Sequence, residues 1–427
     1  MNQRNCMIGQ SGGPTAAINA SLAGVISKAM ETHSFEHIYG TINGIEGLLK
    51  SRYLELTNIF KSADLLLKLL HTPAMYLGSC RYKLPQIPSN ATQTTVITEY
   101  EVIFSTFKKL AITDFFYIGG NDSMDTVMKL SRYALLHNSS IHFIGIPKTI
   151  DNDLYGTDHT PGFGSAAKFV ATSMLEIIHD SMIYTTKSVT IVEVMGRNAG
   201  WLTAATALSR TSYGASPDLI YLPEVIFDIP NFLHSIKSLF EKRKNIIIAV
   251  SEGIHDKNGN FIDDSNFCHE TTATFAPKKD VFGHVIHNGT GKALEHIVAN
   301  AFGCKTRSIE LNVLQRCSMH IASKTDLDES FHVGEAAVSS ALENESAIMI
   351  TMERLTTSDC PYKIKTATRE IESIANIERR VPLEWISKEG NDITKEFYDY
   401  LYPLIQGEAT IKYNNGIPDY MDISHLF

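Results

Sequence analysis

A lysine and two aspartates lie close together between Ile144 and Ala167, in the sequence IGIPKTIDNDLYGTDHTPGFGSAA. Asp151 and Asp153 are two positions apart, so both carboxylates point to the same side if residues 149 to 153 are extended. One carboxylate could then hold a divalent cation while the other accepts a proton, and Lys148 could neutralise a phosphate group. The competing interpretation is a solvated turn rich in Asp and Asn, with Lys148 as an ordinary surface charge.

The residues around this stretch predict where it lies in the fold. His142 to Ile146 form a short apolar run that Pro147 closes, which is typical of a buried strand. Lys148 and the two aspartates then follow at the carboxyl end of the strand, the edge at which open α/β sheets bind ligands. Gly162 and Gly164 precede residues with helical spacing, so the amino terminus of a helix is expected beside the loop.

Length and composition limit the class of protein. A chain of 427 residues exceeds the roughly 250 to 300 residues of a single core, so two domains are expected. The net charge of -9 argues against nucleic-acid binding. There is no apolar run of the roughly 18 residues that a membrane span needs, no apolar signal segment at the start, and no CxxC pair among the six cysteines. The sequence therefore predicts a cytoplasmic protein without a membrane span, a zinc site or a disulfide framework.

Two glycine turns join a predicted strand to a predicted helix. The first, GQSGGPTAAIN, contains Gly12 and Gly13. The second, GGNDSMDT, contains Asn121, Asp122 and Ser123. Glycine lets backbone N–H groups approach a phosphate at the positive end of the helix, although a plain tight turn would leave the same pattern. Asp122 either contacts a metal–phosphate group or caps the helix that follows.

Charged residues follow other predicted strands. Arg197 lies in the turn MGRNAGW, which comes after a long apolar run, and Glu252 ends another such run. Strands alternate with helices along most of the chain, which favours an α/β fold with mostly parallel sheets. From Phe282 to Phe302 we expect a glycine loop and a helix, and from Pro361 to Ile386 a strand, a helix and a loop. The remaining tail to Phe427 shows no clear periodicity.

Eight motifs in this order resemble the phosphofructokinase family: GQSGGPTAAIN, YLGSCR, GGNDSMDT, PKTIDNDLYGTDHTPGFGSA, VEVMGRNAGW, PEV, SEG and LQR. The resemblance runs from about Gly9 to Thr325. It implies two Rossmann-like, three-layer domains between which the chain crosses more than once. Residues 1–162, completed by about 320–385, would bind the phosphoryl donor, residues 163–319 would bind fructose 6-phosphate, and the tail 386–427 would pack on both.

The resemblance also implies a role for individual residues. Asp151 resembles the base that takes the proton from the 1-hydroxyl of the sugar, assisted by Lys148 and Arg197. The expected donor contacts are Gly12, Gly13, Arg81, Asp122, Ser123 and Lys148. The expected sugar contacts are Thr149, Asp151, Met195, Gly196, Arg197, Glu252, Arg316 and, lent by a neighbouring subunit of a homodimer or homotetramer, Arg307. Mg²⁺ would lie between the substrates on Asp122 and Asp153.

Asp122 and Lys148 favour pyrophosphate as the donor. In the pattern of the members that use ATP, the two motifs read GGDGS and PGTIDND, with glycine at the positions of Asp122 and Lys148. A carboxylate at residue 122 would repel the α-phosphate of ATP, and Lys148 adds the charge that holds pyrophosphate. An ATP-dependent enzyme and a non-catalytic regulatory subunit are the alternatives. NAD kinase, which also has a GGD loop, would not account for MGRNAGW.

Three positions depart from the pattern of the family. Asn121 replaces an aspartate associated with the metal, so Mg²⁺ would depend on Asp122 or Asp153. Ser188 replaces an arginine that many members present to the neighbouring subunit, a role for which Lys187 is a candidate. Val313 replaces a hydrogen-bonding residue three positions before the expected sugar-phosphate contact Arg316.

Overall fold

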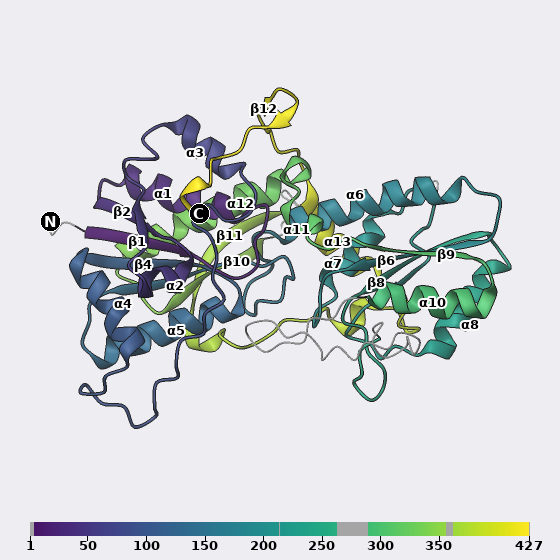
Figure 1. The fold of residues 1–427 in the computed structure, drawn as a ribbon, viewed down its shortest axis with the longest axis horizontal. Helices are drawn as coiled ribbons and strands as arrows, with labels where there is room; N and C mark the ends of the chain where they lie inside the picture. Colours follow the sequence, from purple (N-terminus) through teal and green to yellow (C-terminus); the bar gives the residue numbers. More distant parts are fainter. Residues whose placement is uncertain (1–3, 213, 263–288, 356–361, 427) are drawn as a thin grey trace.

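The fold consists of two α/β parts that lie side by side along the long axis of the molecule (Figure 1). The computed structural model describes residues 4–212, 214–262, 289–355 and 362–426. Phe282 to Asn288, the start of one predicted loop and helix, therefore lie outside the described residues, as do Cys268, Cys360 and Pro361. Within these ranges, no helix has the length and apolar character needed to cross a membrane.

The first part is built on a seven-stranded sheet. Its strands, in spatial order, are β11 (Lys363–Glu370), β10 (Ile348–Leu355), β5 (His142–Pro147), β4 (Ile112–Gly119), β1 (Arg4–Gln10), β2 (Phe35–Thr41) and β3 (Tyr53–Glu55). The five central strands pair in parallel, and only the edge strands β3 and β11 are antiparallel to their neighbours. The prediction of a mostly parallel α/β fold is thus confirmed for this part.

Helices cover both faces of this sheet because neighbouring strand residues point to opposite sides. Phe116 and Ile118 pack on one face and Phe115 and Tyr117 on the other. The first face is covered by α1 (Ile18–Glu31), α3 (Ala63–Leu70) and α12 (Lys324–Leu342). The second is covered by α2 (Gly44–Leu49), α4 (Thr98–Lys109) and α5 (Asn121–Leu136).

The second part is a four-stranded, entirely parallel sheet. Its order is β7 (Leu219–Tyr221), β8 (Asn245–Ser251), β6 (Ser188–Val194) and β9 (Lys305–Glu310). One face packs against α6 (Phe163–Met182), α7 (Trp201–Ala205) and α13 (Lys395–Leu401). The other face packs against α8 (Ile229–Phe240) and α10 (Thr290–Phe302), and the short helix α11 (Leu314–Cys317) follows β9.

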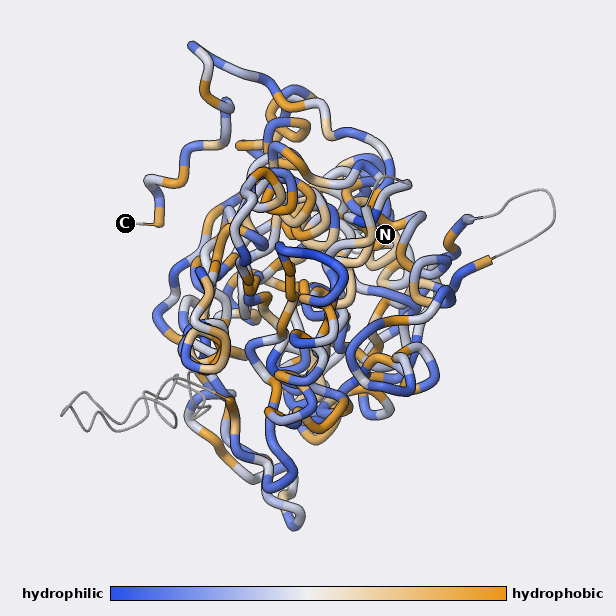
Figure 2. Tube along the Cα trace, turned by 90° about the vertical axis from the view of Figure 1, so that its right-hand side faces the viewer, coloured by the Kyte–Doolittle hydropathy of each residue, from blue (hydrophilic) through white to orange (hydrophobic). Residues whose placement is uncertain are grey.

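The C-terminal quarter departs from the predicted elements. Only a 3₁₀ turn, Ile371–Ser373, is found where a helix was expected after β11. The tail, for which no element was predicted, contains α13 and a two-residue pairing of β12 (Tyr413–Asn414) with β13 (Ile417–Pro418). Figure 2 shows the last residues leaving the body of the molecule and turning back toward it. Because α13 buries Phe397 and Leu401, the tail helix is fixed by tertiary packing rather than by a strong local pattern.

Candidate active site

A cleft of about 910 Å³ is lined by residues from both parts of the molecule. Turns that follow β1, β4 and β5 supply one wall, and turns that follow β6 and β8 supply the opposite wall. Of the residues predicted from the sequence, the cleft is lined by Gly12, Gly13, Arg81, Asp122, Ser123, Lys148, Thr149, Asp151, Asp153, Met195, Arg197, Glu252 and Arg316. Gly196 lies next to this group, and its N–H donates to Oε1 of Glu252 at 3.3 Å.

The loop that carries the two aspartates is not extended, so the premise from which their common direction was predicted is wrong. Asn152 has a φ of 54°, in the left-handed region, and its side chain is fully buried. The N–H of Asp151 donates to Oγ1 of Thr149 at 3.1 Å, which closes a tight turn. Both Asp151 and Asp153 nevertheless line the cleft, because the turn at Asn152 redirects the chain between them.

Lys148 is a buried cation in contact with the first glycine turn. Its side chain is only 2% exposed, so the interpretation as a surface charge is wrong. Its Nζ donates to the carbonyl oxygen of Gly13 at 2.6 Å. A methyl group added at Gly12, whose φ is 81°, would lie 3.2 Å from the same Nζ. Burial lowers the pKa of Lys148 to about 8, although Asp151 and Asp153 oppose this change.

The two aspartates are both easier to protonate than an ordinary carboxylic acid. Burial raises the pKa of Asp151, and the charge of Glu252 raises it further, while Lys148 acts in the opposite direction. Burial also raises the pKa of Asp153, with a second contribution from Asp151. A carboxylate whose pKa is moved toward neutrality is better suited to accept and return a proton near pH 7.

Asn121 and Asp153 form a pair with two unsatisfied oxygens. Nδ2 of Asn121 donates to Oδ2 of Asp153 at 3.1 Å. Oδ1 of each side chain is buried and has no hydrogen-bond partner among the described residues. Hard divalent cations prefer oxygen ligands, so this pair fits Mg²⁺, which uses one or two protein ligands and completes its shell with water and phosphate.

Asp122 is exposed in the first turn of α5 and lines the cleft. It does not cap the helix, because the N-cap position is Gly120 and no side-chain cap is formed. Across residues 4–212, 214–262, 289–355 and 362–426, no three His, Cys, Asp or Glu side chains are grouped to hold a metal without substrate.

Three cations lie around the first glycine turn, despite the net negative charge of the chain. Burial lowers the pKa of Arg316, and the nearby charge of Arg81 lowers it further. A methyl group at Gly13 would lie 3.6 Å from Nη1 of Arg316, so this arginine also borders the first glycine turn. Lys148, Arg81 and Arg316 therefore produce a local field that attracts phosphate groups.

The cleft also contains residues that sequence reasoning missed. Asn376 and Glu378, from the irregular segment after β11, line it. Glu378 accepts a hydrogen bond from Nδ2 of Asn198 at 2.9 Å, and the backbone N–H of Arg379 donates to the carbonyl oxygen of Asp153 at 2.7 Å. The available signals were Asn376 and Pro382, because asparagine and the residue before a proline both disfavour the helix that was predicted there.

Four of the residues discussed for the neighbouring subunit or the sugar do not line the cleft. Arg307 forms an ion pair with Asp180 of α6 at 3.2 Å on the outer surface. Ser188 is buried in β6, where its hydroxyl accepts from Asn245. The Nζ of Lys187 lies over the ring of Phe240, and Val313 is 46% exposed.

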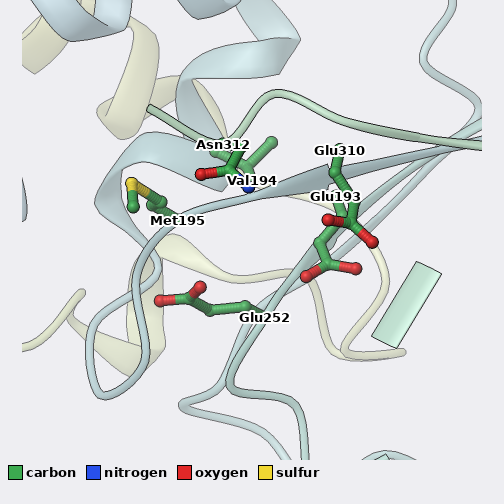
Figure 3. A pocket seen from close by; sticks show the side chains of 6 residues that line it. All are labelled: Glu193, Val194, Met195, Glu252, Glu310 and Asn312. Carbon is green, nitrogen blue, oxygen red and sulfur yellow. The ribbon is translucent and has the colours of Figure 1, made fainter. Parts of the chain in front are cut away.

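A smaller cavity of about 40 Å³ lies at the carboxyl ends of β6, β8 and β9. The carboxylates of Glu193, Glu252 and Glu310 gather around it (Figure 3). Oε2 of Glu193 accepts the N–H of Gly291 at the start of α10, at 2.6 Å. Burial raises the pKa of Glu193 to about 7, and Glu310 and Glu252 raise it in the same direction.

A cleft between two mostly parallel sheets, in which buried carboxylates lie close to cations, defines a phosphoryl-transfer enzyme, because this chemistry needs positioning, positive charge and a base beside the attacking oxygen. A family model described as phosphofructokinase matches residues 5–309. The chain belongs to the phosphofructokinase family.

Individual relatives match almost the whole chain. The pyrophosphate--fructose 6-phosphate 1-phosphotransferase of Methylococcus capsulatus is 37% identical, with coverage of 100% of this chain and 97% of the relative. The protein of the same name from Halomonas elongata is 38% identical, with coverage of 98% and 96%. The crystal structure of the pyrophosphate-dependent phosphofructokinase from Nitrosospira multiformis superposes with a TM-score of 0.85 at 36% identity and covers 98% of this chain and 96% of that one.

Proposed function

We propose that this protein catalyses the reversible, Mg²⁺-dependent transfer of a phosphoryl group from pyrophosphate to the 1-hydroxyl of fructose 6-phosphate, which gives fructose 1,6-bisphosphate and phosphate. The observation that carries the choice of donor is the contact of the buried Lys148 amine with Gly13 in the first glycine turn. Pyrophosphate has no adenosine to contribute binding energy. A cation in contact with the phosphate-binding turn would supply the binding energy that adenosine contributes in ATP.

The seven-stranded part would bind pyrophosphate, and the four-stranded part would bind the sugar phosphate. Asp151 lines the cleft, where the charges of Lys148 and Glu252 both act on it, and it would accept the proton of the 1-hydroxyl. The freed oxygen attacks the nearer phosphorus of pyrophosphate, the bond to the bridging oxygen breaks, and phosphate leaves with that oxygen. Lys148 and Arg316 would balance the charge on the moving phosphoryl oxygens.

The unsatisfied oxygens of Asn121 and Asp153 support a place for Mg²⁺ beside the donor. When bound, Mg²⁺ neutralises charge on the phosphate oxygens. Asp122, exposed at the same end of the cleft, would be a second contact through water and would repel the α-phosphate of a nucleotide.

We also propose that the active form is a homodimer or homotetramer. Arg307 faces outward beside α6 and does not line its own cleft, which suits a residue lent to a neighbouring subunit. Substrates, not nucleic acid or membrane, would be the other partners. The cysteine pattern supports a reducing cytoplasm as the location.

The decisive experiment is a donor assay on the purified protein. We expect kcat/KM with pyrophosphate to exceed that with ATP at saturating fructose 6-phosphate and Mg²⁺, and the reverse reaction to proceed from fructose 1,6-bisphosphate and phosphate. A preference for ATP would reject the donor, and no transfer from either donor would reject catalysis in favour of a regulatory role.

A further inference from the structure

The hydroxyl of Tyr400, in the tail helix α13, contacts the loop that carries the two aspartates. It accepts a hydrogen bond from Nδ2 of Asn152 at 2.8 Å and donates to the carbonyl oxygen of Asp158 at 2.8 Å. Nη1 of Arg379 also approaches it, at 3.4 Å. One phenol group therefore joins two points of the loop that are six residues apart.

The contact with Asn152 matters because of its backbone conformation. Asn152 lies between Asp151 and Asp153 and has a φ of 54°. Asparagine adopts the left-handed region more readily than most residues, but the conformation still needs support from its surroundings. In addition to Tyr400, the amide has one further partner among the described residues, a hydroxyl of Thr160 at the long distance of 3.4 Å.

The ring of Tyr400 is itself held rigidly. Its centroid lies 5.4 Å from those of Trp201 and Trp385, and the guanidinium groups of Arg354 and Arg379 lie 4.7 and 5.5 Å from its centroid. The carbonyl oxygen of Tyr400 accepts from Nη1 of Arg354 at 2.9 Å. A side chain packed in this way holds its hydroxyl at a defined position with little freedom to move.

We propose that Tyr400 is a positioning residue for phosphoryl transfer: through Asn152 it fixes the turn that places Asp151 and Asp153 relative to each other. This inference rests on the proposed function. Tyr400 does not touch the cleft, so its influence on the reaction passes through the loop. Proton transfer and phosphate positioning are sensitive to displacements of about 1 Å, which can lower a rate by up to about a hundredfold.

Tyr400→Phe is the first test, because it keeps the ring and removes only the hydroxyl. We expect kcat at 25 °C to fall about tenfold or more, with the KM for fructose 6-phosphate changed by less than about threefold. Tyr398→Phe is the matched control. Tyr398 lies on the same helix, and its hydroxyl accepts from Arg210 at 3.1 Å, so the control loses a hydroxyl without touching the loop and should keep the kcat of the wild type.

A second variant separates positioning from stability. Asn152→Gly removes the amide but tolerates the positive φ, so the protein should fold while kcat falls to a similar extent. In the double variant, Tyr400→Phe should lower the melting temperature further, because the carbonyl of Asp158 still loses one of its two donors and keeps only Nη1 of Arg379. It should lower kcat no further.

The outcomes are distinguishable. A Tyr400→Phe kcat within about twofold of wild type, or kcat losses that multiply in the double variant, would overturn the positioning role. If Tyr400→Phe does not fold, a wild-type kcat for Asn152→Gly overturns it instead. Absence of transfer in the wild-type protein would reject the proposed function, whereas an active wild type with a fully active Tyr400→Phe would reject only this inference.

Discussion

Nδ2 of Asn121 donates a hydrogen bond to Oδ2 of Asp153 at 3.1 Å, and the Oδ1 atom of each side chain is left without a hydrogen-bond partner among the described residues. The pair brings one negative charge to this place, where the family usually has an aspartate in the position of Asn121. A neutral amide oxygen is a weaker ligand for Mg²⁺ than a carboxylate.

Asn121→Asp should therefore lower the Mg²⁺ concentration that gives half-maximal activity, by roughly two- to tenfold, because a second carboxylate faces the cation. Asn121→Leu, which keeps the size and removes both polar atoms, should raise that concentration. The measurement is initial velocity against free Mg²⁺ at saturating substrates. Identical Mg²⁺ curves for wild type and both variants would show that Asn121 has no part in the metal site.

Asp151→Asn should leave the fold intact and lower kcat by about 10²- to 10⁴-fold, because the amide cannot accept the proton of the attacking hydroxyl. The KM for fructose 6-phosphate should change little. Circular dichroism and thermal unfolding serve as the controls for folding. A turnover within about tenfold of wild type would contradict the assignment of Asp151 as the base.

Lys148→Gly should lower kcat/KM for pyrophosphate by about 10- to 100-fold, since a charged hydrogen bond contributes about 1.5–3 kcal/mol. Asp122→Gly should raise kcat/KM for ATP, because it removes charge and volume near the α-phosphate. Lys83→Gly is the matched control: Lys83 also lines the cleft but is exposed, so a change below about threefold is expected. Unchanged use of pyrophosphate by Lys148→Gly would reject the donor assignment.

Glu193→Gln should stabilise the protein at pH 8 and have little effect near pH 5. The pKa of Glu193 is raised from 4.5 to about 7, so the stability linked to its protonated form is present below pH 4.5 and is lost as the pH rises through 7. Glutamine does not titrate and still accepts the N–H of Gly291. We expect a gain of about 1–3 kcal/mol at pH 8, or a few degrees in Tm.

The control for that experiment is Glu295→Gln. Burial raises the pKa of Glu295, but hydrogen bonds from Ser308 and Lys292 overcome this effect and lower it. Its ionised form therefore stabilises the fold above its unfolded pKa, and the variant should lose stability at pH 8. Equal Tm differences for Glu193→Gln at pH 5 and pH 8 would contradict the titration of Glu193 in this range.

Much of the fold followed from local sequence. The apolar run that Pro147 ends is β5, and the two glycine turns do join β1 to α1 and β4 to α5. The α/β class with mostly parallel sheets is confirmed. It could be predicted because the periodicity of a strand or a helix, and the turn residues that end it, are visible within a short stretch of sequence.

The geometry of the loop could not be predicted in the same way. The left-handed turn at Asn152 is supported by Tyr400, 248 positions away. Asn376 and Glu378 likewise line the cleft together with residues that lie more than 200 positions earlier in the sequence. Spacing within TIDND carries no information about such contacts. The extended conformation on which the common direction of the two aspartates depended is therefore not formed, although both aspartates do line the cleft.

The position of β10 next to β5 has a consequence for the protein during its synthesis. β5 pairs with β4 on one side and with β10 on the other, but β10 ends at Leu355, about 200 residues after β5. At roughly 5–20 residues per second, the ribosome leaves that edge of β5 unpaired for about 10–40 s. An unpaired strand edge invites pairing with other chains, so each nascent molecule passes through an interval in which the strand that leads into Lys148 is open to aggregation.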